Sequence, residues 1–156
     1  MAARSSGTPV SPLEAHLGFW LRFVSNHVSA RFQRQLEQRD ISISEWVALR
    51  TLWAQPETRH AGLVRALGMT KGATSKVVSR LEHKGLAQRA STGNGTGGQA
   101  LVLTAAGRAL VPRLARVADA NDAHFFGHLS AKQRQSLMDA MQALVKHHRL
   151  QQVPTT

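Results

Sequence analysis

The chain has 156 residues, 42% of them hydrophobic, and its 20 Lys and Arg against 9 Asp and Glu give a formal net charge of +11. This length suits one domain with its own core, and the charge favours a polyanionic partner, either nucleic acid or an anionic membrane surface. The absence of cysteine excludes disulfides, Cys-ligated zinc and thiol-based redox sensing. Because no apolar run could span a bilayer and the first residues have no secretory signal pattern, we expect a cytoplasmic protein without a membrane partner.

The first element that the sequence predicts is a long amphipathic helix behind a short tail. Residues 1–12 are small, polar and interrupted by proline, which is typical of a flexible tail. From residue 13 to about residue 36 we expect one continuous helix, because its apolar side chains recur at helical spacing. These side chains are Leu13, Leu17, Trp20, Leu21, Val24, Val28, Phe32 and Leu36.

A second helix is predicted to begin after Ser42. Ser42 and Glu45 have the spacing of a capping box, in which a hydroxyl and a carboxylate each accept a hydrogen bond from a backbone amide. Pro56 ends this helix, because proline cannot continue it. The expected apolar stripe consists of Trp46, Leu49, Leu52 and Trp53.

Two short helices with a tight turn between them follow. The first contains residues 63–67 and stops at Gly68, and Thr70 is placed to cap the second. The second runs to about His83 and ends at Gly85, a residue that readily adopts the left-handed conformation of a helix stop. Two short helices joined by a turn that contains glycine are the pattern of a helix-turn-helix.

The positive charge gathers around this motif. From Arg59 to Arg89 the chain has seven Lys and Arg residues and one acidic residue, Glu82. Helical periodicity puts one side of the second short helix in the core and leaves a polar, basic side outside. Such side chains can contact phosphates and base edges. The candidate DNA-binding residues are Thr70, Lys71, Gly72, Ser75, Lys76, Ser79, Arg80, Arg89 and Asn94.

After Leu86 the pattern changes to that of a β-hairpin. Residues 87–90 and 99–103 are predicted as short strands. The segment 91–98 between them has four glycines in eight residues, which is too many for a helix or a stable strand interior. We therefore expect a flexible hairpin tip there.

Two further helices are predicted to close the chain. Thr104 is placed to cap a fifth helix that reaches about His124. Ser130 and Gln133 have the spacing of a second capping box, which would open a sixth helix. One face of that helix is apolar and consists of Leu137, Met141, Leu144 and Val145.

The order of these motifs resembles that of a known family. The stretch that carries the resemblance is Leu63-Val-Arg-Ala-Leu-Gly-Met-Thr-Lys-Gly-Ala-Thr-Ser-Lys-Val-Val-Ser-Arg-Leu-Glu-His-Lys-Gly-Leu86, followed by Arg89, the hairpin and Leu103-Thr104-Ala-Ala-Gly107. With the long leading helix and the two closing helices, the chain resembles the MarR family of bacterial transcriptional regulators over roughly residues 13–148.

The resemblance implies a mainly α-helical fold and a mode of action. It implies a single domain at 13–150, in which a winged helix-turn-helix lobe with a small β-hairpin wing occupies 42–103. The helices at 13–38 and 104–150 would pair with a second copy of the chain. In the family the second helix of the motif enters the major groove of double-stranded DNA and the wing reaches the minor groove. Small phenolic or lipophilic ligands often release members from DNA.

The hairpin tip departs from the family pattern. Family members usually carry an Asp-x-Arg-type pattern in the wing, whose arginine enters the minor groove. Here residues 92–98 have no charge, and only Arg89 precedes them. The resemblance therefore supplies no arginine at the tip, and the wing is expected to contribute less affinity than usual.

Aromatic residues on the first two predicted helices have two interpretations that can hold together. They are core residues, which is the usual meaning of such stripes, or they form part of a pocket for a small aromatic or lipophilic effector, with His27 or Arg50 as a polar anchor. The candidate pocket residues are Trp20, Phe23, His27, Trp46, Arg50 and Trp53.

The eight histidines raise the alternative of a metal-sensing regulator. His124 and His128 are four residues apart, and His147 and His148 are adjacent. A zinc or nickel site needs three or four convergent ligands, and neither pair has an obvious third ligand. We expect surface histidines and no bound metal.

The sequence offers no support for an enzyme. It contains no nucleophile elbow, phosphate-binding loop or zinc-protease motif, so we expect neither catalysis nor a cofactor. The leading hypothesis is a homodimeric, ligand-responsive transcriptional repressor on a pseudo-palindromic operator. The alternatives are a metal-sensing regulator that uses histidines and an architectural DNA-binding protein without an effector.

Overall fold

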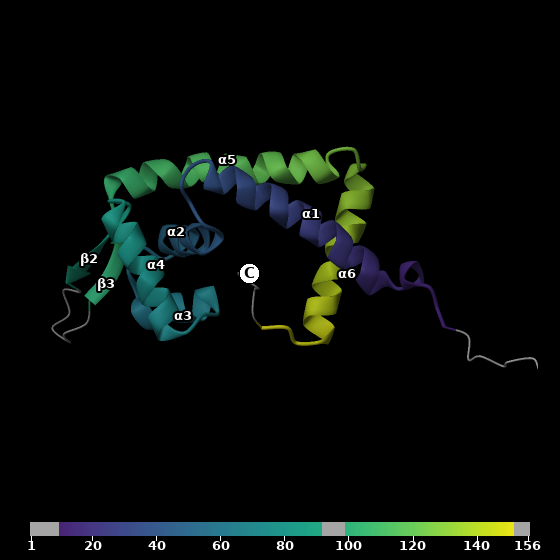
Figure 1. Ribbon diagram of the computed structural model, residues 1–156, viewed down its shortest axis with the longest axis horizontal. Helices are drawn as coiled ribbons and strands as arrows, with labels where there is room; N and C mark the ends of the chain where they lie inside the picture. Colours follow the sequence, from purple (N-terminus) through teal and green to yellow (C-terminus); the bar gives the residue numbers. More distant parts are fainter. Residues whose placement is uncertain (1–9, 92–98, 152–156) are drawn as a thin grey trace, which may run out of the picture.

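The computed structural model describes residues 10–91 and 99–151. In chain order its elements are η1 (Leu13–Ala15), α1 (Leu17–Glu37), α2 (Ile43–Ala54), β1 (Thr58–Arg59), α3 (His60–Leu67), α4 (Lys71–His83), β2 (Ala87–Ser91), β3 (Gln99–Leu103), α5 (Ala105–Phe126) and α6 (Ala131–His147). Figure 1 shows α2, α3, α4 and the strands as a lobe at one end, from which α5 runs to α6 at the other end. α1 packs along α5. The predicted mainly helical fold with a small β-hairpin is therefore confirmed.

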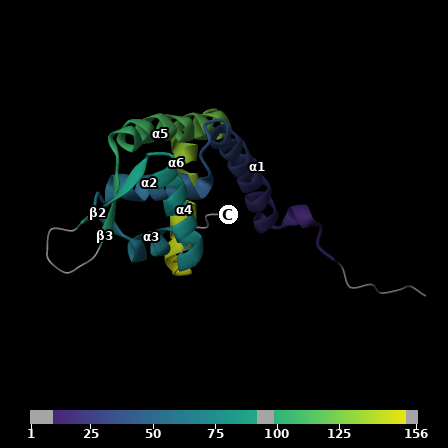
Figure 2. The same ribbon diagram turned by 60° about the vertical axis from the view of Figure 1, so that its left-hand side comes forward.

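The predicted hairpin is present, and the sheet has a third strand that the sequence analysis missed. β3 pairs antiparallel with both other strands, which gives the order β1-β3-β2. In the added pair Thr58 lies opposite Leu101. β1 has only two residues, too few for an alternation of polar and apolar side chains to reveal it. Figure 2 shows the hairpin at the outer edge of the lobe.

The core lies within the lobe, where α2, α3 and α4 meet the sheet and the first half of α5. Its most deeply buried apolar residues are Leu36, Leu49, Leu52, Leu63, Leu67, Val77, Leu81, Val111 and Leu114. Fully burying one such side chain contributes about 1.5–3 kcal/mol. Because α4 supplies Val77 and Leu81, this core determines which side of α4 remains in solvent.

Helix ends occur where local signals predict them. The amide of Glu45 donates to Ser42 Oγ at 3.1 Å, and the amide of Ser42 donates to the Glu45 carboxylate at 2.9 Å. The same reciprocal pair joins Ser130 and Gln133. Gly85 follows α4 with a φ of +69°, the left-handed conformation that glycine adopts without strain. Both capping boxes and this helix stop are therefore confirmed.

The prediction of one continuous helix from residue 13 is wrong. Residues 13–15 form a 3-10 turn, and His16 is extended, with φ −100° and ψ 127°. The α-helix begins only at Leu17. The indole nitrogen of Trp20 donates to the carbonyl of Glu14 at 2.9 Å and holds the turn against the helix. The turn leaves the apolar spacing intact, so the periodicity could not reveal the break.

The predicted apolar stripe of α2 is wrong at one position. Trp53 is 44% exposed, whereas Ala48 is fully buried. The buried side of α2 runs through Glu45, Ala48, Leu49 and Leu52, whose spacing of i, i+3, i+4 and i+7 is that of one helix face. Trp46 is half-buried beside this stripe. The buried side of α2 therefore includes a small residue and a charged residue that hydrophobicity alone did not assign to it.

The ends of the chain add little to the fold. Most of the predicted flexible tail, residues 1–9, lies outside the described residues, as do residues 152–156. Residues 10–12 are exposed and belong to no helix or strand. Over 10–91 and 99–151, no helix is long and apolar enough to cross a membrane.

Candidate nucleic-acid interface

The helix-turn-helix presents α4 at the surface in the orientation that its periodicity predicts. Its buried residues are Thr74, Val77, Val78 and Leu81. Its exposed residues include Lys71, Gly72, Ser75, Lys76, Ser79 and Arg80. Lysine and arginine can reach phosphates and short hydroxyl side chains can reach base edges, so this face has the chemistry of a DNA contact surface.

The N-terminus of α4 is open to solvent. The Oγ1 atom of Thr70 accepts a hydrogen bond from the amide of Ala73 at 3.2 Å. The other amides of a first helical turn have no partner within the helix and attract anions. A Cβ added at Gly72 would lie in open space, so the lobe itself does not require glycine there. Gly72 therefore leaves room for a phosphate to approach the backbone.

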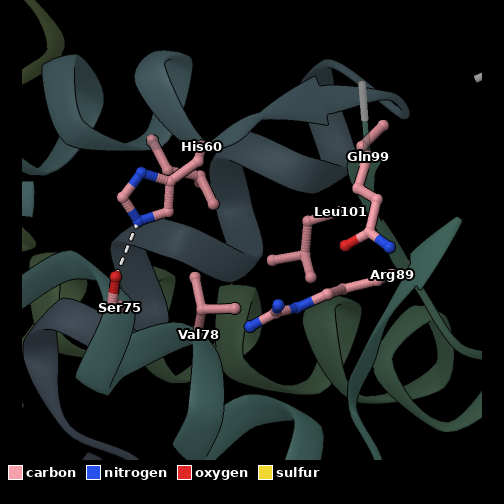
Figure 3. Close-up of a pocket in the computed structure, with 8 residues that line it drawn as sticks. His60, Ser75, Val78, Arg89, Gln99 and Leu101 are labelled. Carbon is pink, nitrogen blue, oxygen red and sulfur yellow. Dashed lines mark hydrogen bonds between the residues drawn. The ribbon is translucent and has the colours of Figure 1, made fainter. Parts of the chain in front are cut away.

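Ser75 is held by two partners, one of which the sequence analysis missed. Its hydroxyl donates to the carbonyl of Lys71 at 2.9 Å. The Nε2 atom of His60, at the start of α3, lies 3.1 Å from the same oxygen (Figure 3). The hydroxyl proton is therefore used within α4, and what remains for DNA is an acceptor lone pair and the imidazole of His60.

The candidate cations fall into two classes. Lys71 and Lys76 are exposed and have no ion-pair partner within the described ranges. The Nε atom of Arg80 lies 3.3 Å from a carboxylate oxygen of Glu45. The Nε atom of Arg89 donates to a carboxylate oxygen of Glu82 at 2.9 Å. The two lysines are therefore free to bind phosphate, whereas each arginine already shares one nitrogen with an acidic residue.

Arg89 also borders a cavity of about 260 Å³ between α3, α4 and the hairpin. Its lining combines an apolar floor with polar side chains at the rim (Figure 3). The lining residues are His60, Leu63, Ser75, Val78, Arg89, Gln99, Ala100 and Leu101. The hairpin tip, with the candidate Asn94, lies outside the described residues. Arg89 and Ser75 of the α4 face therefore line the same cavity.

The six candidate effector-pocket residues lie in two groups. On α1 the ring of Phe23 contacts those of Trp20 and His27, with centroids 6.3 and 4.8 Å away. On α2 the guanidinium of Arg50 lies 5.6 Å from the ring centroid of Trp46. Trp20, Phe23 and Trp53 are about half exposed. None of these six residues lines any of the three cavities that lie beside the hairpin, between α5 and α6, and beside the start of α2.

The histidines at the far end of the chain remain in separate places. The ring of His124 packs against Phe125, with centroids 5.0 Å apart, and the rings of His147 and His148 are 4.8 Å apart. In the part of the chain that the structure describes, no three His, Asp or Glu residues lie close enough to share a metal ion.

Comparison with known proteins agrees with this geometry. The sequence model of the MarR family matches residues 41–92, the segment from α2 through α4 into the hairpin. The HTH-type transcriptional repressor Rv2887 of Mycobacterium tuberculosis is 29% identical over 131 residues, which cover 84% of this chain and 94% of that protein. In sequence and in fold, the chain is similar to the MarR family.

Solved structures of MarR-family regulators extend the match to the whole fold. Rv2887 in complex with salicylic acid superposes with a TM-score of 0.66 at 28% identity, covering 86% of this chain and 97% of that one. A mutant of MepR from S. aureus superposes with a TM-score of 0.74 at 21% identity, covering 85% and 98%. The chain thus has the winged helix-turn-helix fold of these DNA-binding transcriptional regulators.

Proposed function

We propose that this chain is a homodimeric transcriptional repressor that binds a pseudo-palindromic DNA operator and is released by a small aromatic effector. The observation that carries the proposal is the exposed face of α4, on which Lys71 and Lys76 are free of ion pairs within the described ranges. The core holds this face outward through Val77 and Leu81. The absence of a catalytic motif and the DNA partner are consistent with a cytoplasmic, non-enzymatic regulator.

In the proposed complex α4 lies in the major groove. Helices of this kind contact base edges with the residues near their N-terminus, which here are Gly72, Ser75 and Lys76. Thr70 and Lys71 would contact phosphate at the start of the helix. Ser79 and Arg80 follow on the same face, and Arg89 and Asn94 would contact the flanking backbone or minor groove.

The second copy of the chain would cover an apolar surface at the end remote from the lobe. Figure 1 shows α6 and the first half of α1 at that end. Their exposed apolar residues include Trp20, Leu21, Phe23, Val24, Leu137, Met138, Met141, Leu144 and Val145. Exposed apolar surface on this scale marks an interaction surface. We therefore assign residues 13–38 and 104–150 to the dimer interface and 42–103 to the DNA-binding lobe of one domain, 13–150.

An aromatic acid is the class of effector that we propose. Rv2887, at 28–29% identity, has been solved with salicylic acid and with p-aminosalicylic acid. The two candidate groups in this chain pair aromatic rings with a base, Phe23 with His27 and Trp46 with Arg50. Rings contact the apolar body of an aromatic acid and a base contacts its carboxylate. Trp20 and Trp53 would close the pocket once the partner copy is present.

Footprinting on the DNA that flanks the chain's own gene tests this proposal. We expect protection of two half-sites whose centres lie about 34–36 Å apart, one turn of DNA, or a multiple of it. Adding salicylic acid should remove the protection. Binding that ignores sequence and effector would instead favour an architectural protein. Stoichiometric metal in the purified protein would favour the metal sensor.

A further inference from the structure

An ionic cluster around one buried carboxylate joins the start of α2 to the end of α4. The cluster consists of Asp40, Ser42, Glu45, Arg80 and Lys84. It borders a cavity of about 300 Å³ at the surface of the lobe. At its centre, the side chain of Glu45 is only 2% exposed.

Both carboxylate oxygens of Glu45 have partners. One carboxylate oxygen accepts from the amide of Ser42 at 2.9 Å and from the Nζ atom of Lys84 at 3.0 Å. The other lies 3.3 Å from the Nε atom of Arg80. A buried carboxylate is costly unless it is paired. Arg80 of α4 and Lys84, which follows the last residue of α4, therefore compensate the charge of the capping residue of α2.

Lys84 fastens the end of α4 to the turn before α2. Besides Glu45, its Nζ atom contacts the carbonyl of Asp40 and lies 3.5 Å from the Asp40 carboxylate. The side chain of Lys84 is 23% exposed, so most of it is withdrawn from solvent. Lys84 therefore stabilises the packing of α4 against the start of α2 and has little surface left for a DNA contact.

Arg80 differs from Lys84 in what it leaves exposed. Its side chain is 53% exposed, and its Nε atom faces Glu45. Its two terminal nitrogens have no partner among the described residues. A guanidinium is a rigid planar fork, so an ion pair at Nε also orients these two nitrogens. Arg80 itself belongs to the exposed face of α4 that also carries Lys76 and Ser79.

We propose that Glu45 is a positioning residue for DNA binding. It holds Arg80 by Nε so that the two terminal nitrogens are presented to a phosphate of the DNA backbone. This inference rests on the proposed DNA-binding function and assigns part of it to a residue that does not touch DNA. Ordering the guanidinium in advance removes an entropic cost that a free arginine would incur on binding.

A purely electrostatic role for Glu45 predicts the opposite sign. A negative charge near a DNA-binding face repels phosphate, so its removal should strengthen binding. Removal of a positioning residue should weaken binding. Glu45→Gln separates the two, because glutamine keeps an oxygen for the amide of Ser42 and nearly the same volume.

The experiment measures the affinity of the full chain for the duplex that flanks its own gene, over a range of salt concentrations. We expect Glu45→Gln to bind roughly tenfold more weakly, equivalent to about 1.4 kcal/mol. We also expect a shallower salt dependence, by about 0.9 in slope for each lost phosphate contact. A loss of folded protein alone would lower the active fraction and leave the slope unchanged.

Glu37→Gln is the matched control. Glu37 borders the same cavity, and its carboxylate accepts from Gln33 at 2.7 Å. Glu37→Gln removes the same charge as Glu45→Gln but does not affect the ion pair of Arg80. DNA binding by this variant should therefore be unchanged or slightly tighter. In an Arg80→Ala background, Glu45→Gln should no longer weaken binding. Equal weakening in both backgrounds would overturn the proposal.

Arg80→Lys keeps the inference testable even if Glu45→Gln folds poorly. Lysine carries a compact point charge without a planar fork, so an ion pair with Glu45 would not orient further donors toward a phosphate. We expect it to weaken binding about as much as Glu45→Gln does. Affinity of Arg80→Lys equal to that of the unmodified chain would refute the positioning role. A chain that binds no DNA at all would instead refute the proposed function.

Discussion

The Nε2 atom of His60 lies 3.1 Å from the Oγ atom of Ser75, and this contact ties the first residue of α3 to the exposed face of α4. The hydroxyl of Ser75 donates its proton to the carbonyl of Lys71, so in this arrangement it accepts from the imidazole. A side chain proposed to contact DNA is thus oriented by a histidine from the neighbouring helix (Figure 3).

The first prediction is that His60 and Ser75 act as a unit in DNA binding. His60→Ala and Ser75→Ala should each weaken binding, and the double variant should lose less than the sum of the two. Residues in contact typically show coupling energies of about 0.5–3 kcal/mol. A double-mutant cycle measures this coupling from the affinities of the unmodified chain, the two single variants and the double variant for one duplex. Additivity within about 0.3 kcal/mol would show that the contact has no role in binding.

The second prediction separates Lys76 from Arg80. Lys76 is exposed and has no ion pair within the described ranges, so Lys76→Ala should weaken DNA binding and leave thermal stability unchanged. Arg80→Ala should weaken binding and also lower the melting temperature, because it removes one of the two cations beside the buried Glu45.

Each variant should be measured on the flanking duplex and on random DNA. Loss of a base contact costs about 1–3 kcal/mol on the specific sequence only, whereas loss of a phosphate contact weakens all sequences alike. A melting temperature that falls as far for Lys76→Ala as for Arg80→Ala would contradict this division.

The third prediction concerns the hairpin tip. Residues 92–98 carry no charge, so Asn94→Ala removes at most a neutral hydrogen bond, worth about 0.5–1.5 kcal/mol. Its affinity should change by less than about tenfold. Binding of Asn94→Ala is compared with that of Lys76→Ala on the same duplex. If the tip variant is the more damaging, α4 is not the principal reader of DNA.

The fourth prediction tests the dimer. A chain of 17.0 kDa should sediment at about twice that mass. Leu144 is 50% exposed on α6, so Leu144→Glu should leave the folded chain intact and convert the dimer to a monomer, because it places a charge in the apolar interface.

Lys146→Gln is the control for Leu144→Glu, since it changes the net charge equally at an exposed position of the same helix. It should remain dimeric. DNA affinity should fall when the dimer is lost, because a monomer contacts only one half-site. If Leu144→Glu still sediments as a dimer, Leu144 on α6 is not part of the dimer interface.

The local signals in the sequence determined where most helices begin and end. Capping pairs such as Ser42 with Glu45 act across three residues, and Gly85 acts through its own φ, so neither depends on the rest of the fold. The buried and exposed sides of α4 could also be predicted, because helical periodicity gathers its apolar residues on one side and that side packs into the core. The break at His16 and the exposure of Trp53 escaped the same reasoning, because neither changes the apolar spacing.

Only the tertiary structure decided which side chains meet across the site. His60 and Ser75 are 15 residues apart in the chain, and Glu45 and Lys84 are 39 apart. Such pairs depend on how the core packs α2, α3 and α4 against one another, and no local spacing encodes that arrangement. The sequence alone therefore determined Glu45 as a helix cap, and packing made the same carboxylate the partner of Arg80, because burying it required cations from α4.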